Sequence, residues 1–232
     1  MIKKFLILVL IFVSFSSKLS YALVEIDITR GNLDPLPIAV SPLFIQKNNL
    51  KNPEFKEIGE RISEVIEGNF KRSGLFNPLF KESFVQEPEI AHLKPRFEDW
   101  KLIKAQVLVT GKIELENEKL RVEFRLWDVV AAKEILALAF TTVPNNWRRV
   151  AHIISDKVYQ RLTGEKGYFD TRIIYVSEAG PKNARIKKLA IMDQDGSNNK
   201  YLTLGNELVL TPRFSPTNQL VTYLSYFKNL PR

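Results

Sequence analysis

The chain contains no cysteine, and only two of its 232 residues are histidine. The first absence excludes disulfide bonds, thiolate nucleophiles and cysteine-type zinc sites. Two isolated histidines are too few to build both a catalytic triad and a metal site. The sequence also lacks Gly-x-Ser-x-Gly, the motif that presents a serine nucleophile in many hydrolases. These absences favour a binding protein over an enzyme, and we expect no cofactor and no metal.

The charge balance is basic but not patterned for nucleic acid. The formal net charge is +8, yet no block of lysine and arginine is interleaved with aromatic residues. Nucleic-acid binding is therefore weakly supported. The excess charge fits a solvated surface, or attraction to an acidic partner. The composition, 45% hydrophobic and 26% charged, is that of an ordinary globular protein of one or two domains.

Residues 1–22 contain the longest apolar run of the chain. Lys3 and Lys4 precede an apolar stretch over residues 5–15, and Ser20-Tyr21-Ala22 follows. This order is typical of a secretory signal peptide, with cleavage between Ala22 and Leu23. The run is shorter than the roughly 20 residues of a membrane-spanning helix, although an uncleaved anchor is the alternative. The sequence thus predicts export to an aqueous compartment beyond the inner membrane.

The seven residues after the predicted cleavage point alternate apolar and polar side chains over most of their length: Leu23, Val24, Glu25, Ile26, Asp27, Ile28 and Thr29. Such alternation indicates a β-strand with one face in water. The strand could pair with the sheet of its own domain. It could instead bind a partner, because releasing a terminal strand exposes only one row of hydrogen-bonding groups.

Residues 23–163 are predicted to form an α/β domain with helices packed on one mixed sheet. Apolar residues at helical spacing predict two long helices, one from Asn52 to Gly74 and one from Asn145 to Gly164. A strand is expected over residues 37–44. A polar loop is expected over residues 82–95 and a short helix over residues 97–103. Three strands joined by short turns are then expected to form an antiparallel meander, over residues 104–115, 120–128 and 134–143.

Residues 164–170 are predicted to link this domain to a different one over residues 171–232. There, short β-rich runs alternate with Asp-Gly and Ser-Pro turns, as antiparallel hairpins require. The run over residues 174–177 returns about 48 residues later, over 222–225, and a period of roughly 40–50 is that of a four-stranded propeller blade. A first blade and the start of a second cannot close a ring, so we expect an incomplete antiparallel β-propeller.

Several polar residues could suggest chemistry, and a structural role is favoured for each. Arg125 and Asp128 lie in a strand and are expected to make structural contacts, such as an ion pair at the rim of the sheet. His152 lacks a carboxylate at ligand spacing on its helix, although Asp156 could contact it, so packing is favoured over a metal or acid–base role. The run Asp193-Gln194-Asp195-Gly196 has too few ligands for a calcium loop and predicts a tight turn.

Six segments occur in the order typical of one known family: Ser73-Gly74-Leu75-Phe76, Phe124-Arg125-Leu126-Trp127-Asp128, Trp147-Arg148-Arg149-Val150-Ala151-His152, Gly164 to Arg172, Met192 to Gly196, and Pro212 to Pro216. Over nearly all of its length the chain resembles the TolB family of the Tol-Pal envelope system. The resemblance implies an N-terminal domain like the anticodon-binding domain of some tRNA synthetases, which says nothing about tRNA here.

The same resemblance implies a function. It implies a non-enzymatic periplasmic protein that links TolA at the inner membrane to Pal at the outer membrane, in outer-membrane constriction during division and in envelope integrity. It also implies that residues 23–29 bind the TolA C-terminal domain and that the propeller face binds the Pal lipoprotein, with no small-molecule substrate. The alternative from the fold is a propeller-fronted periplasmic hydrolase. Nucleic-acid binding by the first domain is a further hypothesis, but export would remove the protein from that substrate.

Overall fold

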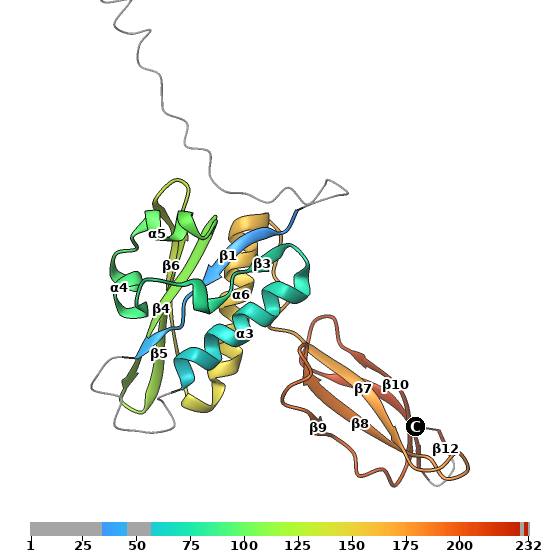
Figure 1. Ribbon diagram of the computed structural model, residues 1–232. Coiled ribbons are helices and arrows are strands. Elements are labelled where there is room, and N and C mark those ends of the chain that lie inside the picture. The colour runs from blue at the N-terminus through green and yellow to red at the C-terminus, as the bar shows by residue number, and fades with distance from the viewer. Residues whose placement is uncertain (1–33, 46–56, 228–229, 232) are drawn as a thin grey trace, which may run out of the picture.

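The computed structural model describes residues 34–45, 57–227 and 230–231. An α/β domain comes first in this range, and antiparallel sheets follow it (Figure 1). The predicted signal peptide (residues 1–22), its cleavage point between Ala22 and Leu23, and the predicted partner-binding residues 23–29 all lie outside the described residues. These three expectations therefore stay predictions.

A six-stranded mixed sheet forms the centre of the first domain, as predicted. The predicted antiparallel meander is present as β4 (Val107–Glu116), β5 (Lys119–Asp128) and β6 (Lys133–Thr142). Strand β1 (Leu36–Val40) lies parallel to both of its neighbours, β3 (Phe76–Pro78) and β4.

The single strand expected over residues 37–44 is instead two strands. The Ser41 N–H still donates to the Val109 carbonyl of β4 at 2.9 Å, but the chain leaves the ladder at Pro42. A two-residue strand, β2 (Phe44–Ile45), then pairs with β4 further along. The reason is local, because Pro42 has no backbone N–H to donate to a neighbouring strand.

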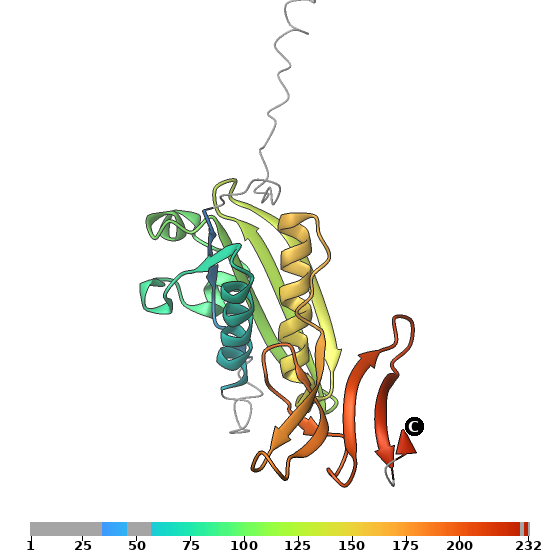
Figure 2. The ribbon, with the colours of Figure 1, turned by 90° about the vertical axis from the view of Figure 1, so that its right-hand side faces the viewer.

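Two long helices, α3 (Ile58–Ser73) and α6 (Trp147–Thr163), lie side by side against this sheet (Figures 1 and 2). A short 3-10 turn, η3 (Pro144–Asn146), precedes α6. The apolar stripes of both helices join the inward side chains of the sheet in the main core. Each helix ends at its predicted glycine, where φ is 71° at Gly74 and 77° at Gly164. Glycine adopts these left-handed angles without steric cost.

On the other side of the sheet, the structure differs from the sequence prediction. Residues 82–95 are predicted to be a loop, but they contain most of η2 (Lys81–Ser83) and all of α4 (Pro88–Leu93). The short helix predicted over residues 97–103 is present as α5 (Phe97–Leu102). Buried Gln86 organises this stretch. Its Nε2 donates to the Lys94 carbonyl at 3.0 Å, and its Oε1 accepts from the Arg96 N–H and from Trp100 Nε1. The stretch around α4 is thus held in place by a polar side chain, and it lacks the regular apolar pattern from which a helix would be predicted.

The second part consists of two three-stranded antiparallel sheets (Figure 2). Their strands are β7 (Arg172–Ala179), β8 (Ile186–Asp193), β9 (Lys200–Tyr201), β10 (Leu208–Phe214), β11 (Val221–Phe227) and β12 (Leu230–Pro231). The two repeated sequence runs fall in β7 and β11. Over the described residues these sheets close no ring, which is the architecture of an incomplete propeller.

Strand β10 contains a proline. It runs from Leu208 through Pro212 to Phe214. A β-bulge between Leu210 and Arg213 accommodates Thr211, whose φ is 47°, and the ladder with β11 then continues. The bulge lets Pro212 sit in a strand without a ladder donor.

The segment over residues 164–170 is packed firmly against the first domain. Phe169 is fully buried in the main core, where its ring lies 5.8 Å from that of Tyr159. The Asp156 carboxylate accepts hydrogen bonds from the N–H groups of Phe169 and Asp170, at 2.6 and 3.1 Å. A side chain at Gly167 would overlap Asp156, so only glycine allows this close approach. The second part is therefore attached to the first by a fixed anchor.

Candidate functional site

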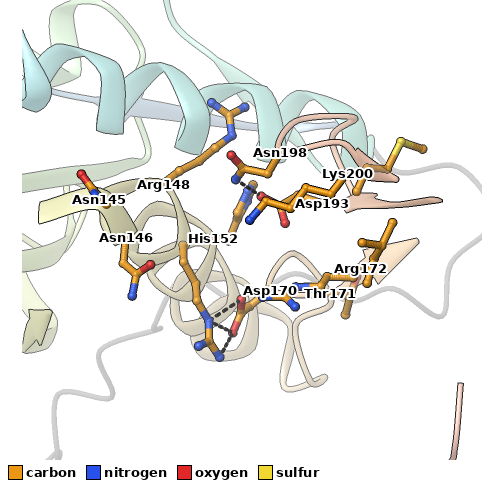
Figure 3. A pocket seen from close by; sticks show the side chains of 13 residues that line it. Asn145, Asn146, Arg148, His152, Asp170, Thr171, Arg172, Asp193, Asn198 and Lys200 are labelled. Carbon is orange, nitrogen blue, oxygen red and sulfur yellow. Dashed lines mark hydrogen bonds and ion pairs between the residues drawn. The ribbon is translucent and has the colours of Figure 1, made fainter. Parts of the chain in front are cut away.

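A polar cleft of about 300 Å³ opens where the N-terminal end of α6 meets the start of β7 and the turn after β8 (Figure 3). The lining side chains from α6 include Arg148, Arg149 and His152, and those from the second part include Asp193 and Lys200. Beside this cleft the two parts of the chain are held together by polar contacts. We call these contacts the junction; its residues are Asn69, Arg148, Arg149, His152, Asp170, Gln194 and Asp195.

The ion pair between Arg148 and Asp195 is the most buried charged contact of the junction. The Asp195 side chain is 2% exposed and that of Arg148 is 25% exposed. Burial by itself would raise the pKa of Asp195. The Ser197 N–H, which donates to Asp195 at 3.0 Å, and the Arg148 guanidinium more than offset this, so the pKa of Asp195 is lowered. Asp195 is therefore a carboxylate fixed against α6.

His152 lies beneath this ion pair and is 2% exposed. Its Nδ1 is 3.0 Å from the side-chain nitrogen of Asn69, and its Nε2 is 3.5 Å from Asp195 Oδ2. An amide nitrogen can only donate, so Nδ1 accepts and the proton of the neutral ring resides on Nε2, toward Asp195. Burial lowers the pKa of His152, Asp195 opposes that shift and Arg148 adds to it.

The orientation of Asn69 is fixed by its other partners. Its Oδ1 accepts from Arg72 Nη2 at 2.6 Å and from Gln194 Nε2 at 2.9 Å, while its Nδ2 also donates to Ser155 Oγ at 2.8 Å. Arg72 is an unambiguous donor, so the amide oxygen must face it. Through Gln194, this buried amide joins α3 directly to the turn after β8.

A third contact lies at the surface. The Arg149 guanidinium makes several hydrogen bonds to the Asp170 carboxylate, at 3.1 to 3.3 Å, and these appear as dashed lines in Figure 3. The Arg149 side chain is 59% exposed, so this ion pair contributes little to stability. It nevertheless connects α6 to the residue directly before the second part.

Three side chains at the junction come close enough to suggest a metal site. Ligand atoms of His152, Asp193 and Asp195 lie within 4.8 Å of one another. Nε2 of His152 makes no hydrogen bond to the described residues, but it carries the ring proton because Nδ1 accepts from Asn69, and Arg148 already binds Asp195. Asn198 likewise donates to Asp193. The arrangement therefore serves to hold the turn and does not form a ligand set.

The junction also does not provide a nucleophile. Ser155 lies one helical turn from His152, but its hydroxyl donates to the Ala151 carbonyl at 2.9 Å and accepts from Asn69. The hydroxyl is buried, and the Nε2 of His152 faces Asp195 instead. A serine held in this way is not activated by the histidine.

Arg125 and Asp128, also singled out from the sequence, have structural contacts, and the second histidine of the chain is buried. Arg125 pairs with Glu134 on the neighbouring strand at 2.8 Å, so an ion pair is present at this strand. Asp128 accepts from the Ala131 N–H at 2.8 Å and holds the turn after β5. His92 is buried against Phe44, and burial lowers its pKa to about 4.

Sequence reasoning missed most of the junction. It considered Asp156 as the contact of His152, but the structure places Asp156 on the anchor segment and Asp195 on His152. The one local signal was the acidic turn itself, since a run such as Asp-Gln-Asp-Gly offers two carboxylates to a neighbour. Nothing in the sequence pointed to Asn69, which lies 125 positions from Gln194.

The fold and this site define a class of protein: an α/β domain docked by a polar junction onto propeller-type antiparallel sheets. Comparison with known families agrees. The family model described as "TolB amino-terminal domain" matches residues 24–135, and that described as "TolB beta propeller domain" matches residues 159–232. The chain belongs to the TolB family.

Two curated relatives carry the name "Tol-Pal system protein TolB". One, from Pelagibacter ubique (strain HTCC1062), is 74% identical over 92% of this chain and 49% of its own length. The other, from Paramagnetospirillum magneticum (strain ATCC 700264 / AMB-1), is 50% identical over 90% of this chain and 46% of its own length. The chain thus spans about half the length of the curated relatives it matches.

A solved structure shows the same fold. The crystal structure of TolB from Acinetobacter baumannii superposes with a TM-score of 0.69 at 24% identity, and the match covers 83% of this chain and 44% of that one. Within the ranges that the structure describes, no helix is long and apolar enough to cross a membrane.

Proposed function

We propose that this chain is a periplasmic adaptor of the Tol-Pal system that works through its binding surfaces. The observation that carries the proposal is the 74% identity, over 92% of the chain, to the Tol-Pal system protein TolB of Pelagibacter ubique. The junction supports it, because its buried charged groups are committed to holding two modules together and present no free nucleophile or base.

In this proposal the chain links TolA to Pal and so supports outer-membrane constriction and envelope integrity. The TolA C-terminal domain binds residues 23–29, and the Pal lipoprotein binds the face of the propeller-type sheets. An alternating apolar and acidic segment at a chain end suits the first role, since it can add as a strand to a partner's sheet.

Calorimetry tests both partners separately. A chain beginning at Leu23 is titrated with the TolA C-terminal domain and, in a second series, with soluble Pal. We expect TolA binding to disappear when residues 23–29 are deleted and Pal binding to survive that deletion. If the deleted chain still binds TolA, the assignment of this segment is wrong. If neither protein binds the intact chain, the adaptor function itself is wrong.

A further inference from the structure

Both the oxygen and the nitrogen of the Asn69 amide make hydrogen bonds in the junction. The junction is therefore sensitive to the protonation state of the His152 ring. Its oxygen accepts from Arg72 and from Gln194, and its nitrogen donates to His152 Nδ1 and to Ser155 Oγ. The donor to Nδ1 requires a neutral ring with a free lone pair at that nitrogen. The set of hydrogen bonds around Asn69 is therefore complete only while His152 is neutral.

We propose that protonation of His152 disrupts the hydrogen bonds that join the turn at residues 193–198 to α3 through Asn69, so that the junction loosens in mild acid. A protonated ring carries a hydrogen on Nδ1, which would point at the amide hydrogens of Asn69. Rotating the Asn69 amide relieves this conflict but turns its nitrogen toward Arg72, which can only donate, and toward the Gln194 nitrogen. In the first arrangement the hydrogen bond between Asn69 and His152 is lost, and in the second the Asn69 oxygen no longer accepts from Arg72 and Gln194 Nε2.

Other charged groups face His152, and none removes the conflict at Nδ1. Asp195 would attract the cation, but it faces Nε2. The remaining charged groups act at longer range or through Asn69: Arg148 and Asp156 on α6, Arg72 on α3, Asp193 on the turn, and Asp170 on the anchor segment. Asp195 is moreover shared, because protonated His152 would compete with Arg148 for the same oxygen, Oδ2.

The sign of the pH effect follows from burial. The pKa of His152 is lowered in the folded chain, chiefly by burial. The neutral ring therefore stabilises the docked junction above the ordinary histidine pKa of about 6.5, and that stabilisation is lost as the pH falls toward the folded-state value. The inference concerns the junction alone and holds whichever protein the chain binds.

The chain suits a direct test because it has two histidines and no cysteine. Nuclear magnetic resonance of the imidazole signals gives the protonation of His152 between pH 8 and pH 5. In parallel, spin labels on Q160C and N183C, two exposed positions in α6 and in the turn after β7, report the distance between the two parts. We expect a narrow distance distribution at pH 8 that broadens at least twofold as His152 titrates.

Three variants make the test specific. Glutamine offers an acceptor and a donor but cannot be protonated, so H152Q is expected to keep the narrow distribution down to pH 5. N69D provides a carboxylate that accepts from a protonated Nδ1, so it should also stay narrow although His152 titrates. H92Q removes the other buried histidine and should broaden like the unmodified chain.

Three results would overturn the inference. One is a distribution that stays narrow after the His152 signals have shifted. Another is broadening that persists in H152Q. The third is a His152 that stays neutral throughout the range from pH 8 to pH 5.

Discussion

The burial of Phe169 predicts that the segment before the second part is one of the costliest places to truncate a side chain. The ring is 0% exposed and packs against Phe70 and Tyr159, with ring centroids 6.4 and 5.8 Å away. Phenylalanine-to-alanine changes in well-packed cores cost about 3–5 kcal/mol. Phe169→Ala should therefore lower the free energy of unfolding by about that amount.

Urea unfolding followed by tryptophan fluorescence measures this effect, because all three tryptophans lie in the first domain. With a slope of about 2 kcal/mol per molar urea, the midpoint should fall by roughly 1.5–2.5 M. Tyr168→Ala is the matched control, since its side chain is adjacent in sequence but 44% exposed, and it should cost about 1 kcal/mol or less.

A simple tether between domains would behave differently. If Phe169→Ala shifted the midpoint no further than Tyr168→Ala, the segment would not be anchored in the core. The argument that it fixes the position of the second part would then fail.

Three further predictions follow from single contacts. Gly167→Ala should lower the free energy of unfolding by about 1–3 kcal/mol, because the added methyl group overlaps Asp156, and thermal melting measures the loss. Asp195→Asn should cost about 2–3 kcal/mol, because it leaves the partly buried Arg148 guanidinium without a carboxylate partner, and urea unfolding at pH 7.5 measures it. Burial raises the pKa of Glu67 to about 7. The stability that comes from its protonated form is therefore fully present below pH 4.5 and is lost as the pH rises through 7. Glu67→Gln should raise the free energy of unfolding more at pH 8 than at pH 5, and urea unfolding at the two pH values measures the difference.

Each of these has a matched control. Gly68→Ala lies within α3 and meets only the flexible end of Arg72, so it should be neutral or stabilising by up to about 1 kcal/mol. Asp170→Asn breaks the exposed pair with Arg149 and should cost about 1 kcal/mol or less. Glu60→Gln, at an exposed position of the same helix, should leave the pH dependence unchanged. A control that matched its test variant would contradict the corresponding argument.

The sequence by itself determined the elements whose signal is local. Helical spacing and the stop signals at Gly74 and Gly164 marked the ends of α3 and α6, and alternation marked the antiparallel meander. The repeat of one β-run and the turn residues between the strands indicated the propeller-type part. These features are readable because each depends on side chains a few positions apart, whose periodicity decides which face is buried.

Only the tertiary structure decided the rest, and the reason is the same in each case. Gln86 organises the stretch around α4, which was expected to be a loop, by hydrogen bonds to residues 8 to 14 positions away, and Asn69 meets Gln194 across 125 positions. A buried polar group must find partners, but packing chooses which ones, and no periodicity records the choice. Likewise, the sequence shows Phe169 only as an apolar residue in a glycine-containing segment, and only the tertiary structure shows that it is buried in the core. The sequence thus specified the modules, and long-range packing specified how they are held together.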